Sequence, residues 1–150
     1  MTQVSVIAIG ASLGGLRALQ IVLRALPREL PASVTVAQHR RADPESRLLS
    51  LLARECALPV IEPEDKAPLE KGHVYLAPSD YHLLVERGSL ALSVDPPVQY
   101  ARPSIDVLFE SVADAYGPAA VGVMLTSSGG DGAMGAAAIK RAGGQVLVQD

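Results

Sequence analysis

Short apolar runs alternate with segments of helical spacing along this chain, and few folds accommodate that alternation. Residues 4–9 form the first apolar run, and a glycine-rich turn at residues 10–15 separates it from a helix pattern over residues 16–26. Further runs predict strands at residues 34–37, 59–61, 74–77, 121–125 and 145–148, and helix patterns lie at residues 44–52, 104–117 and 133–141. Strands that alternate with helices favour right-handed crossovers. We therefore predict an α/β fold with a doubly wound, mainly parallel sheet flanked by helices.

One segment departs from this plan and predicts an inserted β-hairpin. Residues 81–85 and 90–94 read as two strands on either side of a turn at Arg87-Gly88. Hydrophobic residues make up 49% of the chain and aromatic residues only 3%, which suits a core of Leu, Val, Ile and Ala in a parallel sheet. We expect Asp43 to cap the second helix and Pro44 to begin it.

Composition also limits the class of protein. The net charge of −3 argues against a dedicated nucleic-acid binder. The single Cys56 excludes an intrachain disulfide and fits a reducing compartment. The start of the chain does not resemble a signal peptide, and no run approaches the ~18 apolar residues of a membrane span. We expect a cytoplasmic protein without membrane insertion.

Three reactive side chains follow predicted strands, where sites gather in open α/β sheets. Ser12 lies in a Gly-x-Ser-x-Gly turn between a strand and a helix, which can expose a serine hydroxyl beside free N–H groups. His39 ends the second strand, and Asp131 lies in a second glycine-rich loop. A serine nucleophile needs a base, and a histidine base needs an acceptor that fixes its tautomer. Each residue also has a structural interpretation, as a helix cap, a loop histidine or a turn residue.

Other chemistries have less support. No His or Cys pair has the spacing of metal ligands, and neither glycine-rich loop continues into a Walker Gly-Lys-Ser/Thr. Dinucleotide binding remains an alternative, but Ser12 occupies the position of a middle glycine and His39 that of a ribose-binding acid. A catalytically weak relic that binds a protein partner is a further alternative. His73 and His82 are expected to be structural.

Five motifs together resemble the CheB protein-glutamate methylesterase domain. They lie in the family's order at residues 10–15, 38–39, 77–83, 102–109 and 125–133. The resemblance implies a Ser12 nucleophile, a His39 base oriented by Asp131, and no cofactor. It also implies an oxyanion site formed by the backbone N–H groups of Leu13 and Ser128.

The resemblance further implies the substrate. Such enzymes hydrolyse γ-methyl esters of glutamate on the cytoplasmic helices of methyl-accepting chemotaxis receptors, and many deamidate receptor glutamines. We expect Arg102, with Arg40, Arg41 and Arg47, to form a basic rim that binds the acidic substrate.

The sequence departs from the family pattern at several points. Leu13 replaces the usual Thr, and Ser127 and Ser128 replace Gly and Met. We interpret residues 1–150 as a single catalytic domain without the receiver domain that often precedes it and without the family's last elements. The apolar strand at residues 145–148 would then leave part of one sheet face open, so we expect the chain to form homo-oligomers or to be less stable than a version extended by the family's last helix and strand.

Overall fold

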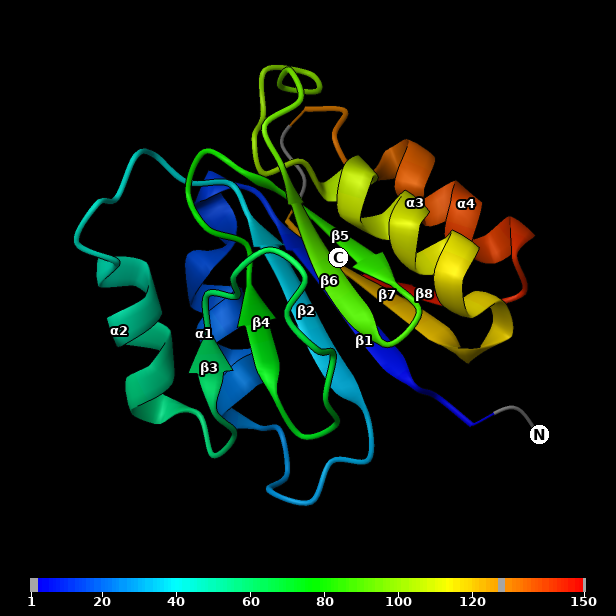
Figure 1. Ribbon diagram of the computed structural model, residues 1–150, viewed down its shortest axis with the longest axis horizontal. Coiled ribbons are helices and arrows are strands. Elements are labelled where there is room, and N and C mark those ends of the chain that lie inside the picture. Colours follow the sequence, from blue (N-terminus) through cyan, green and yellow to red (C-terminus); the bar gives the residue numbers. More distant parts are fainter. Residues whose placement is uncertain (1–2, 127–128, 150) are drawn as a thin grey trace.

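The computed structural model describes residues 3–126 and 129–149. Within this part of the chain, six parallel strands form one sheet in the order β3-β4-β2-β1-β7-β8 (Figure 1). The strands are β1 (Val6–Ala11), β2 (Ser33–Gln38), β3 (Val60–Ile61), β4 (Val74–Leu76), β7 (Ala120–Leu125) and β8 (Gln145–Val148). This confirms the predicted parallel sheet, with β1 near its centre.

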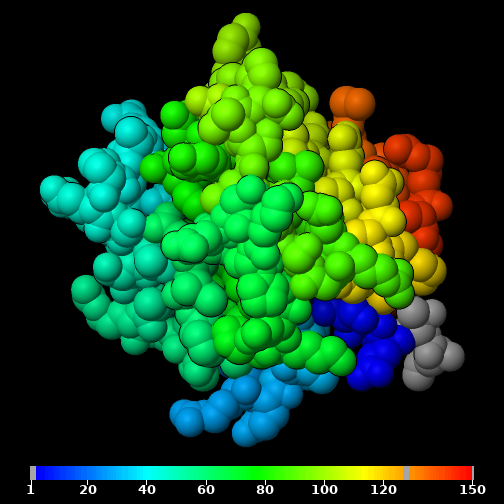
Figure 2. Space-filling view, viewed as in Figure 1, coloured from blue at the N-terminus to red at the C-terminus, as the bar shows by residue number. Residues whose placement is uncertain are grey.

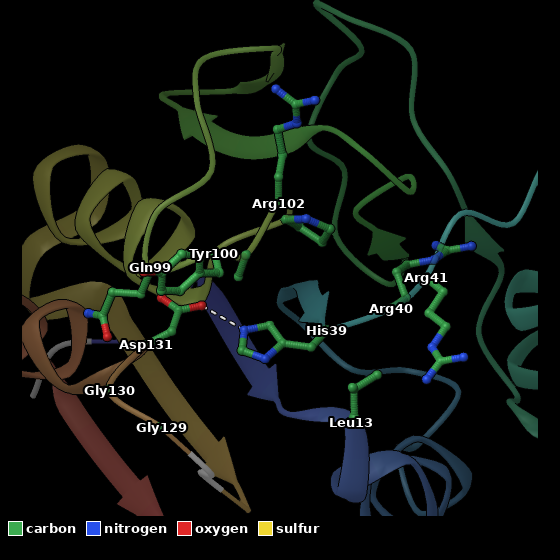
Figure 3. A pocket seen from close by; sticks show the side chains of 12 residues that line it. Leu13, His39, Arg40, Arg41, Gln99, Tyr100, Arg102, Gly129, Gly130 and Asp131 are labelled. Carbon is green, nitrogen blue, oxygen red and sulfur yellow. Dashed lines mark hydrogen bonds and ion pairs between the residues drawn. The ribbon is translucent and has the colours of Figure 1, made fainter.

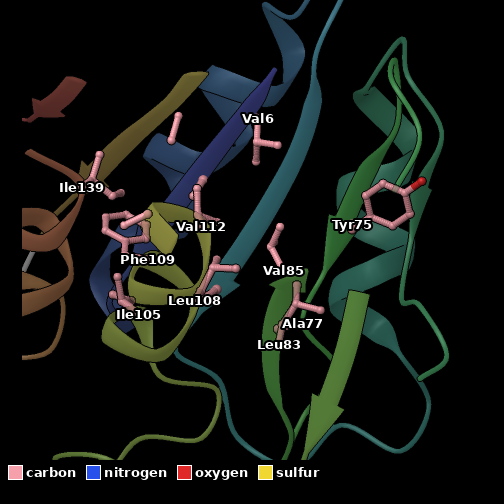
Figure 4. Close-up of a cluster of buried hydrophobic side chains, with 14 of the residues drawn as sticks. Val6, Tyr75, Ala77, Leu83, Val85, Ile105, Leu108, Phe109, Val112 and Ile139 are labelled. Atoms are coloured by element: carbon pink, nitrogen blue, oxygen red, sulfur yellow. The ribbon is translucent and has the colours of Figure 1, made fainter. Parts of the chain in front are cut away.

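Helices cover both faces of the sheet, so the doubly wound prediction is confirmed. The α-helices are α1 (Leu16–Arg24), α2 (Arg47–Glu55), α3 (Ile105–Tyr116) and α4 (Ala133–Arg141), and the 3-10 turns are η1 (Leu13–Gly15) and η2 (Gly117–Ala119). One apolar core contains side chains of α1 and α2 against β1, β2 and β4. The other contains side chains of α3, α4 and the hairpin against the opposite sheet face (Figure 4).

The predicted hairpin insertion is also confirmed. The strands β5 (His82–Glu86) and β6 (Ser89–Ser93) pair antiparallel as a separate two-stranded sheet. The hairpin is fixed to α3 because the Ser111 hydroxyl accepts the Val85 N–H at 2.8 Å. The hairpin therefore extends the core on the α3 side of the sheet.

The start of α2 differs from the prediction. The helix begins at Arg47, and Pro44 lies outside it. Ser46, with a left-handed φ of 52°, separates the two. Asp43 still caps the helix, but from four residues away, because its carboxylate accepts the N–H groups of Arg47 and Leu48, each at 3.0 Å.

The edge strand β8 exposes apolar side chains, with 59% of Leu147 and 67% of Val148 accessible. Neighbouring exposed apolar side chains on a strand edge favour association. Self-association of this chain therefore stays a prediction. Among the described residues, no helix is long and apolar enough to cross a membrane.

Gly135 of α4 packs closely against α3. A Cβ at this position would lie 2.5 Å from the Phe109 Cβ and 3.1 Å from the Cα of Asp106. These neighbours are a backbone atom and the first side-chain atom of a buried residue, so neither can move away cheaply. The small size of Gly135 thus sets the distance between two helices whose N-termini lie at the candidate site.

We expect Gly135→Ala to lower the free energy of unfolding by about 1–2 kcal/mol, because overpacking costs about 1–3 kcal/mol and the helix propensity of alanine returns up to about 1 kcal/mol. Urea unfolding measures the change. The matched control is Gly14→Ala, where a Cβ would meet no atom within 4 Å. We expect the control to stay within about 0.5 kcal/mol of the parent. Equal stability of the two variants would contradict the close approach.

Candidate active site

The register of the sheet brings Ser12 and His39 to one edge. Ala11 of β1 pairs with Gln38 of β2, and Ser12 and His39 are the next residues of these neighbouring strands. The His39 N–H donates to the Ala11 carbonyl at 2.8 Å. The Gln38 side chain donates to the carbonyls of both Ser12 (2.8 Å) and His39 (3.0 Å). Gln38 thereby ties the two segments together just beyond the strands.

Asp131 lies at the N-terminus of α3 and accepts four hydrogen bonds. Its Oδ2 accepts from His39 Nε2 and from the Ile105 N–H, both at 2.7 Å. Its Oδ1 accepts from the Ser104 hydroxyl at 2.8 Å and from the Asp106 N–H at 2.9 Å. Free N–H groups and the helix dipole make this end of a helix favourable for a carboxylate. The structure therefore brings the predicted residues His39 and Asp131 into contact, with Asp131 almost fully buried.

The hydrogen bonds determine the ionisation of Asp131. Burial by itself raises the pKa of the carboxyl, but the bonds from His39, Asp106, Ile105 and Ser104 outweigh burial and hold the pKa below its ordinary value. The carboxylate is therefore charged at neutral pH. An ionised acceptor fixes the proton of the facing histidine nitrogen, which here is Nε2.

The other ring nitrogen of His39 is consequently the basic one. With Nε2 protonated toward Asp131, the lone pair of the neutral imidazole is on Nδ1. Figure 3 shows the His39–Asp131 bond at the centre of the pocket, with Arg40 and Arg41 on the far side of His39 from Asp131. The arrangement places an imidazole of defined tautomer next to the segment that carries Ser12, and its role as a general base stays a prediction.

Asp106 caps the second helix at this site. Its buried Oδ1 accepts the N–H groups of Gly132 (2.9 Å) and Gly135 (2.7 Å). Asp131, just before α4, therefore caps α3, while Asp106, in the first turn of α3, caps α4. Each helix N-terminus is thus capped by a carboxylate from the other segment, and these hydrogen bonds hold the two N-termini together.

Ser12 is more enclosed than the turn pattern predicts. Only 2% of the residue is exposed, and its hydroxyl donates to the Thr126 carbonyl at 2.8 Å. Thr126 Oγ1 lies 3.2 Å from the same hydroxyl oxygen. Since the Ser12 proton is directed to the carbonyl, Thr126 Oγ1 is the donor of this second bond. Among the hydrogen bonds of the described residues, none joins Ser12 to His39.

Thr126 and Gln38 are site residues whose roles the sequence did not reveal. Thr126 has a φ of 44°, a conformation that β-branched residues rarely adopt, and its N–H donates to Gln149 Oε1 at 3.1 Å. Both residues occur in the motifs of the resemblance. Their roles depend on contacts between segments that are distant in the sequence. The only local signal for either residue is its position at the end of a predicted strand.

The structure describes only one of the two predicted oxyanion donors. Leu13 begins η1, and its side chain is 63% exposed and lines the pocket. Ser128 lies outside the described residues. The role of both N–H groups stays a prediction.

Arg102 lines the pocket, but its guanidinium is bound elsewhere. It pairs with Asp80 at 2.6 Å and donates to the carbonyls of Val94 (2.9 Å) and Asp95 (3.1 Å). In Figure 3 the Arg102 guanidinium points away from His39. Its substrate-binding role stays a prediction, and its contacts here fix the base of the segment that contains residues 94–102.

The prediction that Arg40 belongs to an exposed basic rim is wrong. The Arg40 side chain is 5% exposed and pairs with Asp43 at 2.9 Å and Glu62 at 3.0 Å, because the chain folds it between two partly buried acids. Arg47 is exposed but pairs with a glutamate two residues earlier. Arg41 is exposed and makes no ion pair with any described residue.

His82 is buried and held by two hydrogen bonds. His82 is 1% exposed, its Nε2 donates to the Pro96 carbonyl at 3.0 Å, and its Nδ1 accepts the N–H of Ser104 at 3.2 Å. It therefore orients Ser104, whose hydroxyl accepts the Val107 N–H in the first turn of α3 at 3.3 Å, and this agrees with the structural role expected for His82. No cluster of three potential metal ligands occurs in residues 3–126 and 129–149.

Comparison with known proteins identifies the family. The model of the CheB methylesterase family matches residues 7–150. The crystal structure of the Thermotoga maritima CheB methylesterase catalytic domain superposes with a TM-score of 0.89 at 32% identity, over 97% of this chain and 79% of that one. This similarity extends across the sheet and the helices that position the site.

Curated relatives carry related names. A protein-glutamate methylesterase/protein-glutamine glutaminase of Anaeromyxobacter dehalogenans is 47% identical over 99% of this chain and 43% of its own length. Protein-glutamate methylesterase FrzG of Myxococcus xanthus is 42% identical over 96% of this chain and 43% of its own length. The chain thus spans less than half of these two relatives. Their names support the hydrolase interpretation, and not the dinucleotide-binding or noncatalytic alternatives.

The bonds around Asp131 predict how stability depends on pH. The unfolded carboxyl has a pKa of about 3.9, and the folded pKa is lower. The unfolded chain therefore binds the proton first, so this stabilisation is complete above about pH 4 and is lost as the pH falls through the folded pKa. We expect Asp131→Asn to cost about 1–3 kcal/mol at neutral pH, since its amide faces N–H donors.

Urea unfolding of the parent and of Asp131→Asn at a series of pH values measures both effects. The difference in stability between the two proteins should shrink on acidification below about pH 4. A difference that is constant or grows with acid would show that Asp131 is not held as a carboxylate.

Proposed function

Because the chain belongs to the CheB methylesterase family, we propose that it is a serine carboxyl-ester hydrolase that demethylates γ-methyl esters of glutamate on chemotaxis receptors. The observation that carries the proposal is the 2.7 Å bond between His39 Nε2 and Asp131, which leaves Nδ1 as a base beside the Ser12 segment. The proposed substrates are cytoplasmic helices of receptors, so we also propose a cytoplasmic location.

In the first half of the reaction, Ser12 is acylated. Its hydroxyl turns from the Thr126 carbonyl toward His39 Nδ1, which removes the proton as the oxygen attacks the ester carbonyl. The N–H groups of Leu13 and Ser128 would stabilise the oxyanion, and loss of one such donor typically costs about 2.7–4 kcal/mol. Protonated Nδ1 then gives its proton to the departing methoxide, which leaves as methanol.

In the second half, water hydrolyses the ester between Ser12 and the glutamyl group. His39 Nδ1 takes a proton from water and returns it to the Ser12 oxygen, which releases glutamate. Asp131 keeps its charge and stabilises the imidazolium in both halves. A glutamine substrate would follow the same steps with ammonia as the leaving group, as the names of several relatives suggest for those proteins. No step requires a cofactor.

We expect Ser12→Ala to reduce methanol release from methylated receptor membranes by roughly 10³-fold or more, the scale on which serine hydrolases lose their nucleophile. Stability should fall by about 1–3 kcal/mol, because two hydrogen bonds to Thr126 are lost, each worth about 0.5–1.5 kcal/mol. The matched control is Ser33→Ala. Ser33 is another buried serine, and its hydroxyl donates to the Glu70 carbonyl at 2.8 Å far from the site.

The control variant should retain turnover, and fluorophosphonate should label the parent but not Ser12→Ala. Unchanged methanol release in Ser12→Ala would exclude Ser12 as the nucleophile. A parent protein that releases no methanol and resists the label would instead support the noncatalytic relic.

A further inference from the structure

A groove extends along both sides of His39. Two adjoining hollows of about 330 and 340 Å³ share Leu13, His39, Arg40 and Arg41. One continues to residues 99–103 and 129–131, and the other to the start of α2. We call this continuous hollow the His39 groove. Its length on both sides of the base exceeds what a methyl ester alone requires, so it suits a ligand that extends beyond the reacting group.

A strained turn presents an aromatic side chain at one end of the His39 groove. Val98 and Ala101 exchange two backbone hydrogen bonds of 2.9 Å, and the two residues between them, Gln99 and Tyr100, have φ values of 49° and 67°. Such a turn usually contains Asn or Gly, and left-handed residues of other types persist where the surrounding structure holds them. Tyr100 is fully exposed. The segment that carries it projects from the molecule (Figures 1 and 2).

Contacts on both sides fix this turn. The Gln99 side chain covers Gly130, where a Cβ would overlap its Oε1, and Gln99 Nε2 reaches Asp106 at 3.5 Å. On the other side, Arg102 is bound to Asp80 and to two carbonyls of the projecting segment. Tyr100 is therefore exposed on an anchored support, so a partner that binds it loses little conformational entropy.

The His39 groove offers one positive charge that no neighbouring acid of the described residues balances. Four arginines line it, but three of them pair with acidic side chains of the chain itself. Arg41 is the exposed member that makes no ion pair among the described residues. Leu13, 63% exposed, adds an apolar surface next to His39. The groove thus complements a surface that is both apolar and acidic.

We propose that the His39 groove docks one acidic, amphipathic helix of the receptor substrate. Tyr100 and Leu13 contact its apolar side chains, and Arg41 pairs with one of its carboxylates. This inference rests on the proposed function and assigns specificity for the protein substrate to these three residues. An α-helix is about 10–12 Å across, so a helix that places an ester at His39 also reaches beyond it.

The test compares two substrates of the same enzyme, methylated receptor membranes and a small neutral methyl ester. Tyr100→Asn removes the ring but keeps a residue that tolerates the left-handed turn. We expect KM for the receptor to rise about tenfold or more, as for an aromatic anchor of an interface, and by far more than any change with the small ester. Tyr100→Phe keeps the aromatic ring, so its KM for the receptor should stay close to that of the parent protein. Val94→Asn is the matched control, since Val94 is 67% exposed on the same segment but does not line the groove.

Charge gives an independent readout. Receptor hydrolysis by the parent should weaken between 0.1 M and 1 M salt, as the Debye length falls from about 10 Å to about 3 Å, and Arg41→Gln should reduce this salt dependence. An unchanged receptor KM in Tyr100→Asn, or an equal loss with both substrates, would overturn the proposal.

Binding separates this proposal from the proposed reaction. In a Ser12→Ala background, co-sedimentation with receptor membranes reports docking without turnover. Weaker co-sedimentation on adding Tyr100→Asn would support docking even if the parent hydrolysed no ester. Co-sedimentation unchanged by Tyr100→Asn would refute docking even if hydrolysis were normal.

Discussion

The carboxylate of Asp131 at the N-terminus of α3 is the interaction on which the candidate site depends. It lies before α4, caps α3 and fixes His39, so a single buried charge connects two helices to the end of β2. In the opposite direction, the Asp106 carboxylate in α3 accepts N–H groups at the start of α4. Two of the donors to Asp131 are backbone N–H groups in the first turn of α3, so the packing of that helix places the carboxylate that His39 contacts.

The Ser12 hydroxyl contacts Thr126 and not His39. This hydroxyl bonds to Thr126 on both its donor and acceptor sides, while His39 already has its partner. In the proposed reaction, the Ser12 hydroxyl has to leave Thr126 and turn toward His39. Hydrogen bonds of this kind are worth about 0.5–1.5 kcal/mol each, so substrate binding can readily displace them.

Much of the fold was predictable from the sequence, because its signals are local. Apolar runs and helical spacing predicted the parallel sheet, its helices and the hairpin of residues 82–93. The contact between His39 and Asp131 was predicted on chemical grounds, and the carboxyl ends of parallel strands do bring these residues together.

The features that the sequence did not predict depend on contacts between distant segments. Arg40 was expected in a solvated rim, but Glu62, which lies 22 residues later, pairs with it and buries it. The left-handed backbone of Thr126 has no propensity signal, since β-branched residues disfavour it. The late start of α2 accompanies the left-handed backbone of Ser46, which separates Pro44 from the helix and which its residue type does not predict.

The central claim is that Asp131 fixes His39 with its proton on Nε2 and its lone pair on Nδ1. Nitrogen-15 NMR of the histidine side chains tests this claim most directly, because the chemical shifts of the two ring nitrogens report which one carries the proton. Our account predicts that the neutral His39 ring carries its proton on Nε2, and that Asp131→Ala removes this preference. A His39 ring in the Nδ1–H form in the parent protein would contradict the account.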